Sequence, residues 1–234
     1  YTLDISDLKN CKGQAVITAN DRPENFWGVG QQASNTPNNT SPANDNNCRF
    51  IFRNSAPLPI LTATEVKFMI EEAAFRKGDM TLAYSAYKEG ISLSFDMLTS
   101  TYNVNIPAGK EITETNKLAY MNDPSVVPAT SAGLTLTKIM MQKYIALFGH
   151  GVLETWGDMR RYHYSDIDSK TGLQVYRDFV VPTAGDLFVD NLGKPVYRMR
   201  PRFNSEYVWN ILELQRIGAT TTIYHTQEMW FSQP

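Results

Sequence analysis

The sequence lacks most features that mark a catalytic, metal-binding or membrane-spanning chain. Its 234 residues include only two cysteines and three histidines. It contains no HExxH zinc motif, no GxSxG nucleophile motif and no glycine-rich phosphate-binding loop after a strand. No apolar run approaches the roughly 18 to 20 residues that a membrane-spanning helix needs. These absences argue against a zinc peptidase, a serine hydrolase, a phosphate-binding enzyme and a transmembrane helix.

The charge balance excludes a further class. The 22 basic and 24 acidic residues leave a net charge of −2, and the basic residues are scattered, so no positive surface for nucleic acid is expected. The acidic residues offer many accidental pairs but none that stands out as a glycosidase acid and its partner. We therefore expect a non-enzyme with no cofactor and no nucleic acid partner.

The two cysteines and the first residue say little about cellular location. Cys11 and Cys48 could form a disulfide in an exported protein or remain free thiols. The sequence starts at Tyr1 without a Met, and its first residues form neither the basic nor the apolar region of a signal peptide, so we expect that any targeting segment was removed or lies upstream.

The composition predicts one domain over residues 1–234. Apolar residues make up 42% of the chain and aromatic residues 12%, enough for a substantial core. Residues 1–57 are predicted to be rich in loops and short strands, and the Asn-, Ser-, Thr- and Pro-rich run 31–47 is predicted to be a surface loop. Residues 58–234 are predicted to be mainly helical, so the fold class is mainly α with a few short strands.

A helical hairpin is predicted over residues 62–91. Thr62 and Glu65 form a capping-box pattern, and Gly78 and Asp79 are typical of a helix end followed by a new N-cap. The spacing within the hairpin resembles part of a tetratricopeptide repeat. The first helix is predicted to have an apolar face composed of Val66, Met69, Ile70, Ala73 and Ala74. The second is predicted to have an inward stripe composed of Leu82, Ala83, Ala86, Tyr87, Gly90 and Ile91.

The rest of the chain alternates helices with irregular segments. We expect a short helix at 114–121 within an irregular stretch. A long helix is expected to begin at Thr135 or Thr137, to be interrupted or kinked at Gly149 and Gly151, and to resume to about residue 162. Residues 165–202 are predicted to be turn-rich with short strand-like pieces. A last helix is predicted over 205–217, with Trp209 in the core.

The densest polar and aromatic group is the segment 154–161. Trp156 and Arg160 are spaced to stack, and Asp158 and Arg161 are spaced to pair. The segment could clamp an anion or a sugar, or it could form a buried network that ties down a neighbouring loop. We favour the network, because planar Arg suits buried pairing.

Two pairs of residues that include acidic side chains are not expected to form functional sites. Glu71 and Glu72 are adjacent on a predicted helix, and we expect them on its solvated face. His150 and Glu154 have the i, i+4 spacing that could chelate a metal, but no other ligand pattern supports such a site.

Ligand contacts are most plausible at Trp27, a large aromatic in a glycine-flanked loop beside Asn25 and Phe26. Sugar rings pack their C–H faces on aromatic planes while nearby amides bond the hydroxyls. We favour the other interpretation, in which Phe26 and Trp27 pack under the long polar loop. Tyr102 and Tyr120, in or beside the irregular stretch, are further candidate platforms.

Three segments together resemble the SusD/RagB family, especially its SusD-like branch. They are PLPILT to FRKGD (57–79), QKYIALFGHGVLETWGDMRRY (142–162), and 202–231, in which Arg202, Asn204, Glu206, Asn210 and Trp230 stand in family order. They span most of 57–231, and the chain corresponds to the later part of the family's architecture.

The resemblance implies a mainly helical body with tetratricopeptide-like hairpins and an N-terminal lipid anchor on a cysteine outside this sequence. It implies reversible capture of a glycan or another nutrient at the bacterial outer surface, and delivery to a SusC-type TonB-dependent outer-membrane transporter. A tetratricopeptide-like scaffold that binds a peptide or protein is the alternative, and a glycosidase is the third choice.

Overall fold

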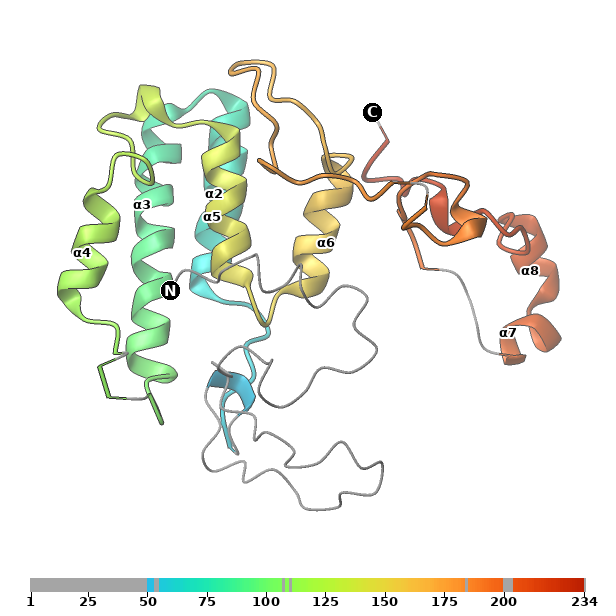
Figure 1. Cartoon of the computed structure of the whole chain (residues 1–234), viewed down its shortest axis with the longest axis horizontal. Helices are drawn as coiled ribbons and strands as arrows, with labels where there is room; N and C mark the ends of the chain where they lie inside the picture. Colours follow the sequence, from blue (N-terminus) through green and yellow to red (C-terminus); the bar gives the residue numbers. More distant parts are fainter. Residues whose placement is uncertain are drawn as a thin grey trace.

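The computed structural model describes residues 50–52, 55–106, 108–109, 111–183, 185–199 and 204–233. Trp27, Asn25, Phe26, Cys11 and Cys48 lie outside these ranges. The described chain holds seven α-helices: α2 (Ala63–Lys77), α3 (Met80–Asp96), α4 (Glu114–Asn122), α5 (Leu136–Leu147), α6 (Val152–Arg161), α7 (Asn204–Trp209) and α8 (Ile211–Arg216). Figure 1 shows α2 to α6 side by side and α7 and α8 at the opposite end of the molecule from α4. The predicted mainly α fold class is confirmed.

The predicted hairpin consists of α2 and α3, and its ends are fixed by the predicted residues. The Thr62 hydroxyl accepts a hydrogen bond from the Glu65 amide at 3.1 Å. Gly78 adopts φ of 88°, the left-handed conformation that favours glycine, and ends α2. Asp79 caps α3 by accepting from the Leu82 amide at 3.0 Å. Local capping chemistry therefore places the turn between the two helices.

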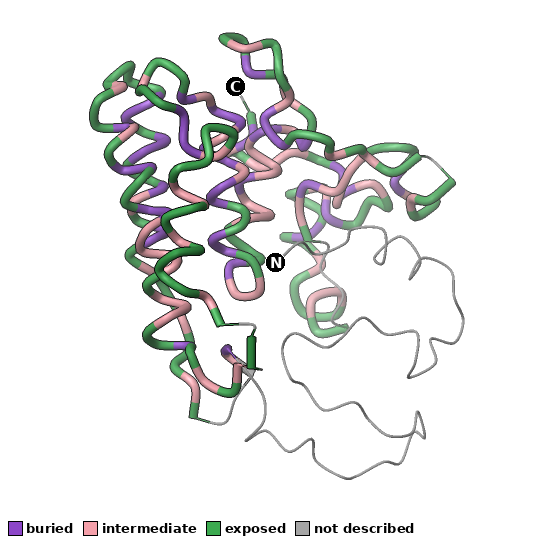
Figure 2. The backbone as a smooth tube through the Cα atoms, turned by 60° about the vertical axis from the view of Figure 1, so that its left-hand side comes forward, coloured by how far each residue is buried: buried purple, intermediate pink, exposed green. Residues whose placement is uncertain are grey.

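The two helices of the hairpin differ in how well sequence predicted their buried faces. In α3, the predicted inward residues Ala83, Ala86, Tyr87, Gly90 and Ile91 are buried, and Leu82 is the one member of the predicted stripe that is exposed. The prediction that the apolar face of α2 packs into the core is wrong, because all residues of that face except Ala74 are exposed. The buried face carries Thr64, Glu65, Phe68, Glu71, Glu72, Ala74 and Phe75 instead. The tube in Figure 2 shows buried and exposed residues alternating along these helices.

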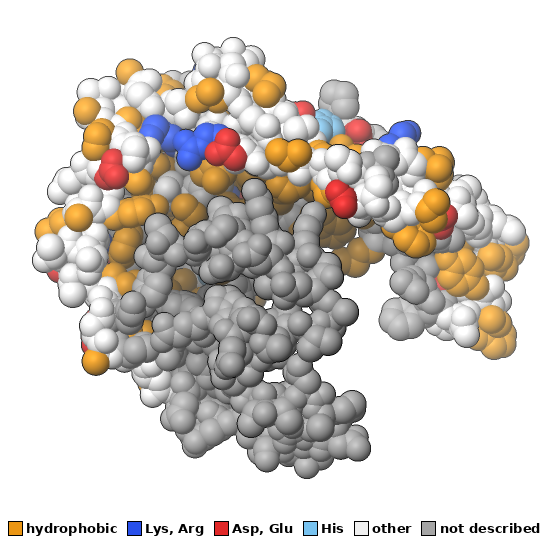
Figure 3. Space-filling view, viewed as in Figure 1, with side chains coloured by type: hydrophobic (Ala, Val, Ile, Leu, Met, Phe, Trp, Pro, Cys, Tyr) orange, Lys and Arg blue, Asp and Glu red, His pale blue; other side chains and the backbone are white. Residues whose placement is uncertain are grey.

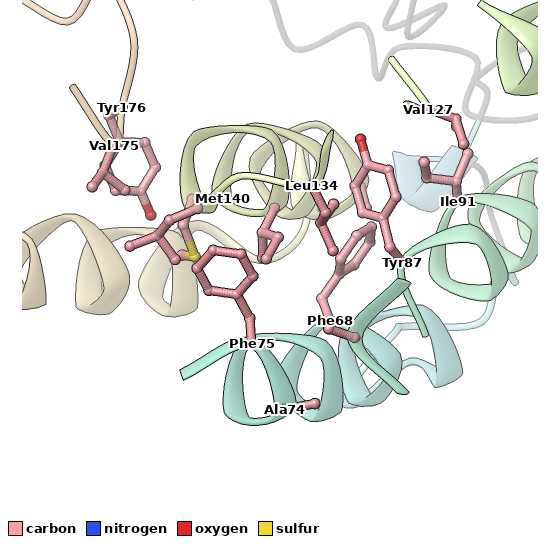
Figure 4. Packing of buried hydrophobic residues seen from close by; sticks show 14 of the residues in the cluster. Phe68, Ala74, Phe75, Tyr87, Ile91, Val127, Leu134, Met140, Val175 and Tyr176 are labelled. Carbon is pink, nitrogen blue, oxygen red and sulfur yellow. The ribbon is translucent and has the colours of Figure 1, made fainter. Parts of the chain in front are cut away.

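The main core lies between α2, α3 and α5. Phe68 of α2, Tyr87 of α3 and Ile139 and Met140 of α5 are fully buried, and Figure 4 shows Phe68, Tyr87 and Met140 in the space between the helices. The Tyr87 hydroxyl donates to the Val126 carbonyl at 2.7 Å, so the irregular segment before α5 is held on the same core. Burial of apolar area at this junction stabilises the helical body.

Gly90 is required by the close approach of α2 and α3. A Cβ built at Gly90 would lie 3.2 Å from the Cζ atom of Phe68, whose ring is fully buried. The absence of a side chain at Gly90 therefore gives Phe68 its place in the core.

The predicted long helix 135–162 is two helices, α5 and α6. Gly149 adopts φ of 90°, and Gly151 precedes the first residue of α6. The predicted interruption at these glycines is confirmed, and the break lets α6 lie beside α5 instead of continuing it.

Beyond α6 the described chain is largely irregular. The strand-like pieces predicted within 165–202 are wrong for the residues seen here, where Ile167 and Gln174 form one isolated bridge. A second small buried cluster of Leu214, Ala219 and Tyr224 lies in the C-terminal segment 185–233. The predicted last helix is broken at Asn210 into α7 and α8. None of the described helices has the length and apolar character to cross a membrane.

Candidate functional site

Helix α6 is joined to α2 and α5 by a charged cluster. Arg161 Nη2 lies 2.8 Å from Glu72 Oε2 of α2 and 2.7 Å from Asp158 Oδ1 of its own helix. Lys143 Nζ of α5 lies 2.6 Å from the other carboxylate oxygen of Asp158. The predicted pair of Asp158 and Arg161 is confirmed, and it forms part of a network across three helices.

The second oxygen of Glu72 is also fully occupied. The Tyr162 hydroxyl donates to Glu72 Oε1 at 2.6 Å and accepts from Arg76 Nη2 at 2.6 Å. Burial alone would raise the pKa of Glu72, but hydrogen bonds from Arg161 and Tyr162 lower that pKa to about 2. Glu72 is therefore ionised across the physiological range, and the prediction of a solvated side chain there is wrong.

Glu71, the neighbour of Glu72, has the opposite character. It is fully buried, and neither carboxyl oxygen has a hydrogen-bond partner among the described residues. Burial, and then the charge of Glu72, raise the pKa of Glu71 to about 9. Glu71 is thus a neutral carboxylic acid at pH 7, and the prediction of a solvated face is wrong for it as well.

A pocket of about 380 Å³ opens over the charged cluster. Arg76 and Arg161 stand at its surface, while Glu72 and Asp158 are nearly buried beneath them. The complete lining is Met69, Glu72, Ala73, Arg76, Lys143, Asp158 and Arg161. Its volume lies within the range of small-molecule sites.

Arg160 connects α6 to the C-terminal segment. Its guanidinium lies 3.7 Å from the centroid of the Trp156 ring and 4.9 Å from that of Phe231. Its Nη1 donates to the Tyr197 carbonyl at 2.8 Å. The predicted stacking of Trp156 and Arg160 is confirmed, and so is the interpretation that Arg hydrogen bonds from this helix tie down a neighbouring loop.

His163 makes a second connection to the chain's end. Its Nδ1 lies 2.8 Å from Asp166 Oδ2, and its Nε2 lies 2.9 Å from the Ser232 carbonyl oxygen. A hydrogen bond with Asp166 is the main cause that raises the pKa of His163, and Glu228 contributes at 3.5 Å. Both ring nitrogens face acceptors, so the protonated ring satisfies both contacts.

The candidate platform residues within the described chain have structural contacts. Tyr102 is buried at 5% exposure, and its hydroxyl donates to the Pro57 carbonyl at 2.8 Å. Tyr120 is partly buried, with its hydroxyl 3.0 Å from Gln142 Oε1 and its ring edge-on to Phe95. The structure does not bring Tyr102 and Tyr120 together with the charged cluster. Ligand contact by Trp27, Asn25 and Phe26 stays a prediction.

Two tryptophans near the end of the described chain are exposed, which the sequence did not predict. Trp209 is 86% exposed, which corrects its predicted core position, and Trp230 is 82% exposed. Figure 3 shows apolar side chains gathered at the end of the molecule that holds α7 and α8. Apolar periodicity around Val208 and Leu212 suggested burial, because periodicity reports a face without saying what covers it.

The possible metal ligands of the described chain are its acidic side chains and histidines. No group of three or more His, Cys, Asp or Glu side chains there could hold a metal ion. The carboxylates of the charged cluster are paired with cations, which suits a rigid scaffold.

Comparison with known proteins adds one match. The model of a SusD-like family, described as starch-binding and associating with the outer membrane, matches residues 10–183. No curated protein and no solved structure matches the chain.

Proposed function

Because the chain belongs to the SusD-like family, whose members bind starch and associate with the outer membrane, we propose that it captures a glycan there without altering it. It then passes the glycan to a SusC-type TonB-dependent transporter. The match over residues 10–183 is the observation that carries this proposal. Attachment to the surface is through an N-terminal lipid anchor outside this sequence.

The construction of the described chain supports a binding role. The charged cluster joins α2, α5 and α6 through close contacts, and Arg160 and His163 hold the C-terminal segment. Such a scaffold keeps ligand-binding loops in place at little further entropic cost. Reversible stacking and hydrogen bonding are sufficient for capture and release.

Calorimetry with maltoheptaose and soluble starch tests the proposal, together with a reducing-end assay on the same mixture. We expect saturable binding with no released reducing ends. Turnover by the purified protein would support the glycosidase instead. An export signal followed directly by a cysteine in the precursor would support the lipid anchor, and a cytoplasmic start would contradict it.

Trp27 is the residue proposed for stacking. Trp27→Ala is expected to weaken glycan binding by about tenfold without unfolding the protein, since aromatic contacts contribute about 1 kcal/mol or more. Unchanged affinity would remove Trp27 from the site.

The outer face of α2 favours a second candidate, a tetratricopeptide-like scaffold for a protein partner. Val66, Met69 and Ile70 are between 36% and 45% exposed along this face, and exposed apolar faces mark interaction sites. Binding of a peptide partner together with indifference to sugars would favour this candidate.

A further inference from the structure

The pocket over the charged cluster turns its positive groups outward. The side chain of Arg76 is 54% exposed and that of Arg161 31%, whereas those of Glu72 and Asp158 are only 8% and 10% exposed. An incoming molecule therefore meets guanidinium groups before it meets carboxylates. The arrangement favours an anion over a cation.

Arg76 and Arg161 also keep unused hydrogen-bond donors in the pocket. Arg76 uses its Nε and Nη2 atoms on Glu72 and Tyr162, and Arg161 uses its Nε and Nη2 atoms on Asp158 and Glu72. A guanidinium has five N–H donors. The Nη1 atom of each arginine thus has no hydrogen-bond partner among the described residues, and its two donors remain for a ligand.

The acceptors of the pocket are already engaged. Glu72 accepts hydrogen bonds from Arg161, Arg76 and Tyr162. Asp158 is paired with Lys143 and Arg161. A cationic ligand would have to displace these contacts. An anionic ligand would add to them by using donors that the protein leaves open.

The remaining wall of the pocket is apolar. Met69 is 45% exposed, and it lines the pocket together with Ala73. The C–H face of a pyranose can pack against such a surface while a charged substituent reaches the arginines. Glu65, buried further along the inner face of α2, does not line the pocket.

We propose that this pocket binds the anionic group of an acidic glycan, either a uronate carboxylate or a sulfate ester, with Arg76 as the main contact. The inference rests on the proposed function, because it takes the ligand to be a glycan. It narrows the substrate class to sugars that carry negative charge. Charge-assisted hydrogen bonds from the open Nη1 donors of Arg76 and Arg161 to an oxyanion give the specificity.

The test compares three probes by calorimetry on the whole chain: trigalacturonate, a sulfated disaccharide and maltotriose. Trigalacturonate or the sulfated disaccharide is expected to bind more tightly than maltotriose, and the stronger of the two identifies the anionic group. Affinity for the acidic probe is expected to fall as salt rises. Equal affinity for maltotriose, or binding of maltotriose alone, would overturn this inference and leave the proposed function standing.

The variants Arg76→Gln and Lys77→Gln give a matched pair, since both remove one positive charge at the exposed end of α2 but only Arg76 lines the pocket. Arg76→Gln is expected to weaken the affinity for the acidic probe by at least about tenfold, and Lys77→Gln is expected to leave that affinity unchanged. Arg76→Lys, which keeps the charge but loses the fork of donors, is expected to fall between wild type and Arg76→Gln. Equal losses of affinity in Arg76→Gln and Lys77→Gln, or no loss in either variant, would overturn the assignment of Arg76 as the main contact. Failure of all three sugars on the wild-type chain would count against the proposed function as well.

Discussion

Arg161 and Glu72 stand 89 residues apart in the sequence, and their guanidinium and carboxylate groups lie 2.8 Å apart between α6 and α2. Glu72 is held ionised by this contact, with a pKa of about 2. The pair is a main link between the hairpin and the second half of the helical body.

Removal of this link should lower stability. Arg161→Met leaves Glu72 buried without its main partner, so the free energy of unfolding is expected to fall by about 2 to 3 kcal/mol. Chemical denaturation measures the change. Arg216→Met is the control, because its pair with Glu213 is exposed and its loss is expected to cost less than about 0.5 kcal/mol. Equal effects of the two substitutions would contradict a structural role for the cluster.

Glu71 should make stability depend on pH. The unfolded chain ionises Glu71 near pH 4.5, but in the folded protein its pKa is about 9. The unfolded state therefore releases this proton first, so the contribution of Glu71 to stability is largest below pH 4.5 and declines as pH rises to about 9. The slope is at most about 1.4 kcal/mol per pH unit.

Glu71→Gln removes the titrating group and should flatten this decline. Denaturation midpoints at pH 5, 7 and 8.5 for wild type and variant measure the difference. Parallel pH profiles would show that Glu71 is ionised in the folded protein.

His163 should make the hold on the C-terminal segment sensitive to pH. Asp166, Glu228 and the Ser232 carbonyl all face the ring as acceptors, and the pKa of His163 is raised above 6.5. The stabilisation is complete below pH 6.5 and is lost as pH rises through the raised pKa. Protection of the amides near Ser232 from hydrogen exchange, corrected for the intrinsic rate, should fall over that range in wild type. In His163→Gln the protection should be low at every pH, and identical protection profiles would contradict the contact.

Two glycine substitutions should act in opposite directions. Gly90→Val introduces atoms against the buried Phe68 ring and is expected to destabilise by about 1 to 3 kcal/mol. Gly157→Ala in α6 meets no atom within 4 Å, so helix propensity should stabilise it by about 0.5 to 1 kcal/mol. Thermal unfolding of both variants checks this, and a stabilised Gly90→Val would mean that α2 and α3 do not pack this closely.

Sequence predicted the helices well because their ends are encoded locally. Thr62, Gly78 and Asp79 act on residues within one turn, and the glycines before α6 break the chain where they stand. The buried face of α2 was not predictable in the same way. Glu72 looks like a surface residue unless its distant partner Arg161 is known, and no local pattern marks Glu71 as buried.

The candidate site shows the same division between local and distant information. The stacking of Trp156 on Arg160 and the pairing of Asp158 with Arg161 follow from spacing on one helix. The pocket that joins Arg76 to Arg161 does not, since α2 and α6 meet only in the folded chain. The exposure of Trp209 likewise depends on what packs beside α7.

Glycan capture without chemistry is the central claim, and one titration tests it most directly. Maltoheptaose and trigalacturonate are each added to the purified chain, heat of binding is recorded, and the recovered sugar is analysed for new reducing ends. The account predicts saturable binding of a glycan that is recovered intact. Absence of binding to both sugars, or recovery of shortened products, would contradict it.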